Sequence, residues 1–185
     1  MRLVWVLIAG WITGCAIQIH RPELPPPPSS TAGAGLEVIL PAALTDLRKE
    51  LLCGTAGARG IECAEPPAQW IVTLLGKHLE RAGVVVLPAG TIGHPRALRL
   101  EGQLLELFSQ GVPDVATVTT KADVRIALLE PDGSPGGQEP HELSATGKVE
   151  SVLQNWRWNY QQAVDQAVAK LLAQATERII ARMRR

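Results

Sequence analysis

Two cysteines, Cys53 and Cys63, stand in a glycine-rich stretch and have the most readily assigned chemistry in the chain. A metal site favours a C-x-x-C pair with histidine partners nearby, and the spacing here does not provide one. A phosphate-binding loop ends in Gly-Lys-Ser/Thr, whereas Ile61 and Glu62 follow Gly60. In an exported chain a disulfide is the natural pairing, and it would contribute roughly 3 kcal/mol on the chain-entropy model.

The N-terminus argues that the chain is exported. Residues 1–14 combine one positive side chain with a short apolar run, as a secretory signal peptide does. The run is too short to cross a bilayer, which takes roughly 20 residues. Four residues at its end resemble a bacterial lipobox: Ile12, Thr13, Gly14 and Cys15. We therefore expect Cys15 to receive lipid and to become the mature N-terminus, which leaves Cys53 and Cys63 as a pair.

The alternative for Cys15 is an unmodified thiol in an ordinary signal peptide or in an N-terminal anchor. One acyl chain holds a protein on a membrane only marginally, but the three chains of a bacterial lipoprotein hold it stably. Ala16 follows where an aspartate would resemble an inner-membrane retention signal. The sequence therefore predicts an outer-membrane, lipid-anchored protein that faces the periplasm.

Residues 15–35 form a proline-rich segment that we expect to be a tether. Its four consecutive prolines, Pro25 to Pro28, favour an extended polyproline helix, and the Ser, Gly and Ala residues beyond them favour flexible coil. Recognition by a proline-binding domain is the alternative. Residues 36–185 remain as one folded domain of ordinary size.

Composition narrows the function classes. The chain has 18 basic and 18 acidic residues and 46% hydrophobic residues, so it has enough apolar side chains for a core and no excess charge for nucleic acid. No serine elbow, H-E-x-x-H, His/Asp/Cys grouping or paired-carboxylate motif is legible, although residues distant in sequence can converge. His78 is a lone histidine on a predicted helix, which is more often solvated or packed than catalytic. We expect no enzyme activity, no cofactor and no metal.

Periodicity predicts an α+β fold. Helical spacing of apolar residues predicts helices over 66–83 and about 158–182, with a short one over 43–52. Runs rich in β-preferring residues predict strands at 36–40, 84–87, 97–108, 115–129 and 141–153. The glycines between 53 and 63 are expected to interrupt regular structure. The order β-α-β-β-β-β-α indicates a two-layer sandwich, with both main helices on one face of a mostly antiparallel sheet of about five strands.

The long strands predict one dry and one wet face. We expect these side chains to point inward: Leu98, Leu100, Leu104, Phe108, Val118, Ala122, Val124, Ile126, Leu128, Leu143, Ala145, Gly147 and Val149. Lys121, Asp123 and Arg125 are expected on the wet face. Trp156 and Trp158 stand just before the last helix. They either pack over its N-terminus or form an aromatic ledge for a partner or an apolar ligand.

Several short stretches resemble the YajG-type family of bacterial lipoproteins. They are 109–111 (Ser-Gln-Gly), 119–124 (Thr-Thr-Lys-Ala-Asp-Val), the Asp-Gly turn at 132–133, 79–86 (Leu-Glu-Arg-Ala-Gly-Val-Val-Val) and, loosely, 45–48. The loop from Cys53 to Cys63 departs from that pattern. The resemblance implies a lipoprotein domain and supplies no catalytic residues. The architecture is also similar, more distantly, to auxiliary lipoproteins of ABC-type lipid transport and to the lipopolysaccharide-assembly lipoprotein, a fold-level analogy.

Two functions are therefore expected in order of preference. The first is a non-enzymatic envelope adaptor that binds another envelope protein, for example by its wet sheet face or by strand addition at a sheet edge. The second is a lipid or lipopolysaccharide transport accessory that binds an acyl chain between the sheet and the helices.

Overall fold

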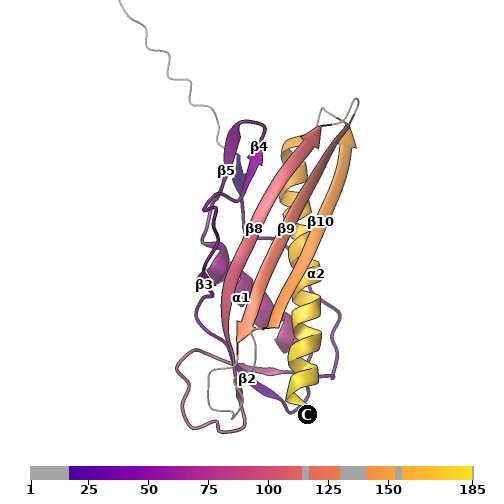
Figure 1. The fold of residues 1–185 in the computed structure, drawn as a ribbon. Coiled ribbons are helices and arrows are strands. Elements are labelled where there is room, and N and C mark those ends of the chain that lie inside the picture. Colours follow the sequence, from indigo (N-terminus) through magenta and orange to yellow (C-terminus); the bar gives the residue numbers. More distant parts are fainter. Residues whose placement is uncertain (1–16, 114–116, 130–140, 153–155, 185) are drawn as a thin grey trace, which may run out of the picture.

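The computed structural model describes residues 17–113, 117–129, 141–152 and 156–184 (Figure 1). Within these residues the helices are α1 (Pro67–Arg81) and α2 (Trp156–Met183). The strands are β1 (Gln18–Ile19), β2 (Glu37–Ile39), β3 (Thr45–Asp46), β4 (Gly54–Ala56), β5 (Arg59–Cys63), β6 (Val85–Leu87), β7 (Leu98–Arg99), β8 (Glu101–Pro113), β9 (Thr117–Leu129) and β10 (His141–Val152).

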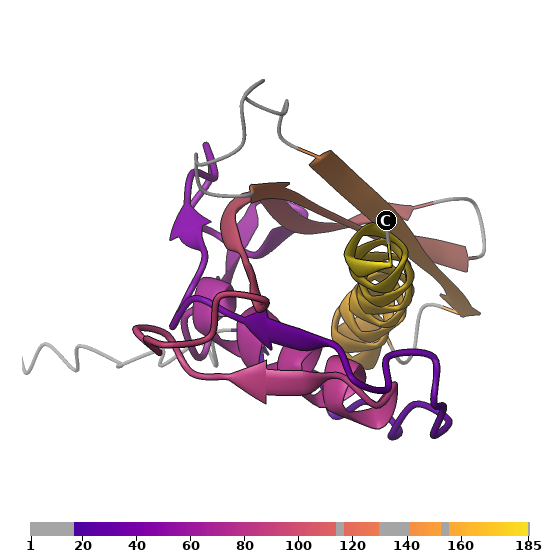
Figure 2. The ribbon, with the colours of Figure 1, turned by 90° about the horizontal axis from the view of Figure 1, so that it is seen from below.

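The strands pair into a large and a small sheet. In the described residues the large sheet has seven strands in the order β1-β5-β4-β8-β9-β10, with β3 also paired to β8, and the small sheet has the order β6-β2-β7. The long strands β8, β9 and β10 are antiparallel, whereas β4 and β3 join β8 in parallel. Both helices lie on the same side of the long strands (Figure 2). The predicted α+β sandwich is confirmed, with a mixed rather than mostly antiparallel sheet.

The alternation predicted for the long strands holds along β9 and β10. The inward residues Val118, Ala122, Val124, Ile126, Leu128, Leu143 and Ala145 are buried. Lys121 and Arg125 are exposed on the opposite face, and Asp123 is half-buried there. Helix α1 begins at Pro67, close to the predicted start, and ends before Gly83, whose φ of 87° suits a helix C-terminus. For β9, β10 and α1 the period of the apolar residues, two in the strands and 3.6 in the helix, was enough to predict the element and its buried face.

Strand β8 departs from the predicted alternation at a β-bulge. The register with β9 shifts between Leu104 and Glu106, so that one additional residue is accommodated on β8. Beyond the bulge Leu107 is buried, and Phe108 lies half-buried on the outer face, opposite Asp123. The prediction that Phe108 points inward is therefore wrong, because an uninterrupted period of two cannot anticipate an inserted residue.

The predicted helix over 43–52 is also wrong. This segment contains β3, which pairs in parallel with β8, and the amide of Leu47 donates to the carbonyl of Leu104 at 2.9 Å. Leu44 is buried, whereas Leu51 is 79% exposed. A ten-residue helix is marginal on its own, so the open edge of β8 offers these backbone groups a better set of partners.

The proline-rich segment does not extend away from the domain over its described part, residues 17–35. Strand β1 pairs with β5, and Ile19 is only 1% exposed. Farther along, the amide of Ser30 donates to the carbonyl of Arg81 at 2.9 Å, and that of Gly33 to the carbonyl of Ala82 at 2.6 Å. The described part of the predicted tether is therefore held against the domain, because Ile19 and the backbone of 30–33 find partners there.

Helix α2 crosses the dry face of the long strands at backbone contact. Its buried stripe includes Tyr160, Val164, Ala167, Val168, Leu171, Ala175 and Ile179. At Gly147 on β10 a Cβ atom would lie 2.8 Å from the amide nitrogen of Ala167 and closer still to the carbonyl oxygen of Ala163. Only a glycine fits between the strand and the helix at this point. The alternation along β10 predicts Gly147 on the inward face, but a period-2 pattern does not indicate how closely a helix approaches.

We predict that Gly147→Val lowers the free energy of unfolding by about 3 kcal/mol or more, since the added side chain meets helix backbone that cannot rotate away. The matched control is Ser144→Val, an exposed position on the same strand, which should change the free energy by less than about 0.5 kcal/mol. Urea unfolding followed by circular dichroism measures both. Equal midpoints for the two variants would show that the α2 crossing is not tight.

Candidate functional site

The described chain begins with β1, whose pairing with β5 fixes the N-terminal segment to the sheet; we call this pairing the clamp at β1. The carbonyl of Ile17 accepts from the amide of Glu62 at 3.2 Å, and the carbonyl of Ile19 accepts from the amide of Ala64 at 2.8 Å. His20 exchanges two hydrogen bonds with the side chain of Gln161 on α2, at 2.8 and 3.1 Å. The N-terminal segment is thereby fixed to β5 and α2. Cys15 and the rest of the predicted lipobox lie outside the described residues.

Strand β5 is itself held by the predicted disulfide. Cys53 and Cys63 are bonded in the structure, with their Cα atoms 5.5 Å apart. The glycine-rich stretch between them forms the β4–β5 hairpin instead of an irregular loop. Gly57, at a φ of 61°, makes its turn, and a Cβ on Gly54 would lie 2.9 Å from the carbonyl carbon of Ser109. Glycine here permits a tight turn and close strand pairing.

A buried arginine stands beside the disulfide. The side chain of Arg48 is 6% exposed and holds Asp46 through two parallel contacts, Nε to Oδ1 and Nη2 to Oδ2, each 2.9 Å. Its Nη1 also donates to the sulfur of Cys53 at 3.4 Å. The hydrogen bonds and charge of Arg48 lower the pKa of Asp46. Sequence reasoning missed this group, because a predicted helix over 43–52 would have spread these side chains along its surface.

A groove of about 600 Å³ lies between this segment and the outer face of β8 and β9. Its lining is Leu47, Arg48, Lys49, Glu50, Leu105, Glu106, Leu107, Phe108 and Arg125. Leu47 is 49% exposed, although it is a large apolar residue. Arg125 lies between two carboxylates, 3.7 Å from Glu106 and 3.9 Å from Glu142. The groove thus combines apolar surface with charges of both signs. It was not predicted, because the β8 bulge and the 43–52 segment create it together.

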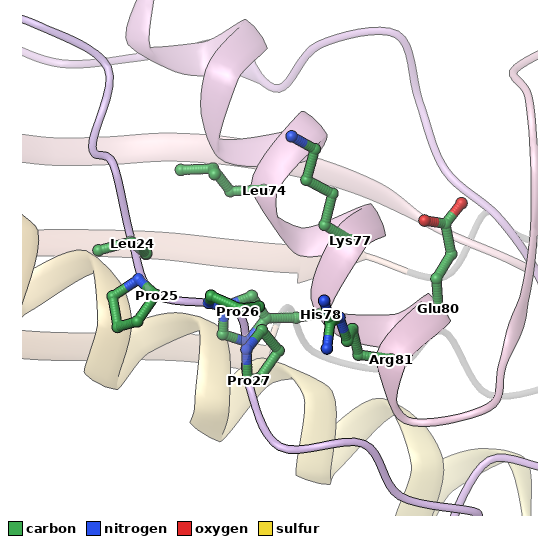
Figure 3. Close-up of a pocket in the computed structure, with 9 residues that line it drawn as sticks. All are labelled: Leu24, Pro25, Pro26, Pro27, Leu74, Lys77, His78, Glu80 and Arg81. Atoms are coloured by element: carbon green, nitrogen blue, oxygen red, sulfur yellow. The ribbon is translucent and has the colours of Figure 1, made fainter.

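A second, smaller cavity of about 360 Å³ lies where the proline-rich segment passes α1 (Figure 3). Its lining is Leu24, Pro25, Pro26, Pro27, Leu74, Lys77, His78, Glu80 and Arg81. Burial lowers the pKa of His78, so its ring is neutral at neutral pH. Within the described residues its Nε2 atom has no hydrogen-bond partner. His78 is therefore half-buried and packed, one of the two ordinary outcomes expected for a lone histidine.

Trp156 and Trp158 lie in the first turn of α2, and their side chains are outside the described part of the structure. Whether they cover the helix or form a ledge stays a prediction. The described residues contain no group of three or more His, Cys, Asp or Glu side chains that could hold a metal ion. None of the helices in those residues is long and apolar enough to cross a bilayer.

Asp165 on α2 contrasts with Asp46. Burial raises the pKa of Asp165, and a hydrogen bond of 2.7 Å from Gln161 only partly offsets this effect. The negative charge of Glu23 raises the pKa further. A carboxylate at this position therefore costs stability, whereas the carboxylate of Asp46 contributes to it.

We predict opposite effects for the two matched substitutions Asp46→Asn and Asp165→Asn. At neutral pH the first should lower the free energy of unfolding, by less than about 1 kcal/mol, because it removes a partly exposed ion pair. The second should raise that free energy, because it removes a carboxylate whose charged form is disfavoured in the fold. Urea unfolding at several pH values measures both.

The pH dependence follows from the direction of each pKa shift. The contribution of Asp46 is present above its ordinary pKa of 3.8 and is lost as pH falls through its lowered folded value. The penalty at Asp165 is complete above its raised folded pKa and disappears as pH falls below 3.8. Both differences from the parent protein should therefore vanish in strong acid. Differences of the same sign at neutral pH would contradict the assignment.

Comparison with known proteins establishes the fold and no more. No family model and no curated protein matches this sequence. The structure is similar to protein XCC0632 from Xanthomonas campestris, of the family model DUF330, with a TM-score of 0.50 and 15% identity over 89% of this chain and 93% of that chain. Weaker likenesses include the hypothetical protein CT253 from Chlamydia trachomatis (TM-score 0.45, 11% identity, 80% of this chain and 98% of that chain). Another is lipoprotein GNA1162 from Neisseria meningitidis (TM-score 0.36, 13% identity, 79% of this chain and 99% of that chain). The resemblance to YajG-type lipoproteins stays a prediction, and the fold is one that this chain shares with XCC0632.

Proposed function

We propose that this chain is a non-enzymatic lipoprotein of the outer membrane, anchored through Cys15, whose periplasmic domain docks another envelope protein. The lipobox-like residues before Cys15 support the anchor, and Ala16 supports the outer membrane. No catalytic motif is legible in the sequence, and this favours a binding role over a catalytic one. The groove beside Phe108 carries the proposal for docking.

The lining of the groove favours a polypeptide as its occupant. Leu47 and Phe108 offer apolar contact, while Lys49 and Arg125 stand near Glu50 and Glu106. Charges of both signs around an apolar centre match a protein surface, in which an apolar anchor is ringed by polar contacts. A lipid headgroup of one sign would leave half of these charges without a complement.

Strand addition at the edge of β10 is a weaker alternative for the partner. Gln166 of α2 accepts from the amide of Lys148 at 3.3 Å, and Lys170 donates to the carbonyl of Thr146 at 2.9 Å. These side chains occupy backbone groups that an added strand would need. We therefore place the partner in the groove.

A photo-reactive amino acid in place of Phe108 should form a protein adduct of defined mass in intact cells. The same probe at Ile92, which is 88% exposed and does not line the groove, should form none. Leu47→Asp should abolish the Phe108 adduct because it places a charge in the groove. Leu51→Asp, which alters an exposed leucine outside the groove lining, should not. An adduct insensitive to Leu47→Asp, or none at Phe108, would rule the groove out.

An acyl-binding accessory role is the second candidate, and one observation favours it in the groove. Leu105 and Phe108 line the groove together with Lys49, a combination that suits an acyl chain with an anionic head. The interface between α2 and the sheet is not suited to this role, because it is filled by fully buried residues such as Ala163, Val164 and Leu171.

Organic extraction and mass spectrometry of the purified protein test this second candidate. Bound acyl species should be recovered from the parent and lost from Phe108→Asp, in addition to the covalent lipid of Cys15 that both proteins keep. Recovery of the covalent lipid alone from the parent would exclude it.

A further inference from the structure

We propose that one end of the domain rests directly on the lipid surface. This anchor end comprises the hairpin turn with Gly57, Ala58 and Arg59, the end of β8 with Val112, and the first turn of α2 (Figure 1). The inference rests on the proposed lipidation of Cys15 and adds to it a contact face and an orientation.

The reach of the chain sets the distance from the membrane. Cys15 precedes Ile17, the first described residue, by two positions, and two extended residues span at most about 7 Å. Ile17 is held in place, because its carbonyl accepts a hydrogen bond from the amide of Glu62 and Ile19, two residues farther on, is buried. A free tether over residues 15–35 would have kept the domain tens of ångströms from the headgroups. With the clamp at β1 the lipid attaches next to the folded surface.

The strand registers show which surface lies next to Cys15. Strand β1 runs parallel to β5, with Gln18 opposite Glu62, so the chain enters β1 from the side of Arg59 and the hairpin turn. Strand β4 runs parallel to β8, with Thr55 opposite Gln110, which places the turn level with the end of β8. The hairpin turn and Val112 therefore share one end of the large sheet.

The start of α2 is at the same end. A Cβ on Gly111 would lie 3.4 Å from the Cζ atom of Tyr160, so the residue preceding Val112 packs against α2. Trp156 and Trp158 precede Tyr160 on the helix and lie farther toward this end. Figure 1 shows the hairpin, the end of β8 and the beginning of α2 together, with β2 at the opposite end.

The residue types at the anchor end suit a lipid interface. Val112 is 54% exposed, which is unusual for a valine in a long strand and leaves apolar surface without a partner in the described residues. Tryptophan is favoured at the level of lipid headgroups because its ring is amphipathic. The first turn of α2, at this end of the domain, contains two tryptophans. The exposed Arg59 supplies a cation for headgroup phosphates.

This orientation leaves the docking groove accessible. Phe108 precedes Val112 by four strand residues, which corresponds to about 14 Å at 3.4 Å per residue. The groove would then face sideways just above the headgroups, where a membrane-embedded or lipid-anchored partner can reach it. The opposite end, which holds Val85 on β6, would point into the periplasm.

A matched pair of tryptophan substitutions tests the orientation. Val112 and Val85 are the same residue type with similar exposure, 54% and 49%, at opposite ends of the domain. Val112→Trp and Val85→Trp are each made in the lipidated mature protein, residues 15–185, that also carries Trp156→Phe and Trp158→Phe. Because Trp5 and Trp11 lie in the predicted signal peptide, which is removed, buried Trp70 is the common background. The proteins are reconstituted in vesicles of phosphatidylethanolamine and phosphatidylglycerol, with and without brominated acyl chains near the headgroups.

Brominated lipid should quench the emission of Val112→Trp and leave that of Val85→Trp unchanged. Flotation of the vesicles, with Cys15→Ser as the negative control, reports the anchor separately. Protein that floats but shows equal emission loss at both positions, or none, overturns the orientation and leaves the lipid anchor standing. Protein that fails to float overturns the anchor and the orientation together. If circular dichroism shows that Val112→Trp misfolds, the emission of Trp156 and Trp158 in the parent protein is measured instead. Absence of quenching by brominated lipid in the parent would then overturn the inference.

Discussion

The contact between α2 and β10 at Gly147 is the constraint on which the other parts of the structure depend. The helix approaches the strand so closely that a single Cβ would collide with the backbone of Ala163 and Ala167. Because α2 is seated here, Gln161 reaches the backbone of His20 and Arg184 reaches the carbonyl of Ala32. One helix therefore closes the sheet and also secures the N-terminal segment at two points.

Securing that segment bears directly on the proposed lipid anchor at Cys15. Burial of Ile19 alone stabilises the docked segment by roughly 1.5–3 kcal/mol. The β4–β5 hairpin that receives it is braced by the disulfide and by its pairing with β8. A domain on a long flexible tether samples every orientation, whereas a domain clamped near its lipid presents a fixed face to a partner. The proposed position of the groove, on the flank of the sheet, follows from this fixed geometry.

The sequence alone predicted the elements with strong periodicity. The apolar stripes of α1 and α2 and the alternation along β9 and β10 are local patterns. Each predicted the correct element because the residues that repeat with that period are the ones buried in the core. The Cys53–Cys63 pairing also followed from composition and expected compartment, since few other partners exist for two such thiols in this chain. The groove beside Phe108 could not be found this way, because it joins a bulge on β8 to a segment that lies more than fifty residues earlier.

Local residue patterns were enough to predict the α+β composition, the two helices and the three long strands, and they give the expectation of a lipid at Cys15. The positions of the weakly patterned segments, in contrast, depend on contacts that exist only in the folded protein. Residues 17–35 and 43–52 have too little intrinsic preference to fix their own conformation, so open strand edges and exposed helix carbonyls capture their backbone groups. A backbone hydrogen bond carries no side-chain signature, and for this reason the clamp at β1 and the groove appear only once the chain is folded.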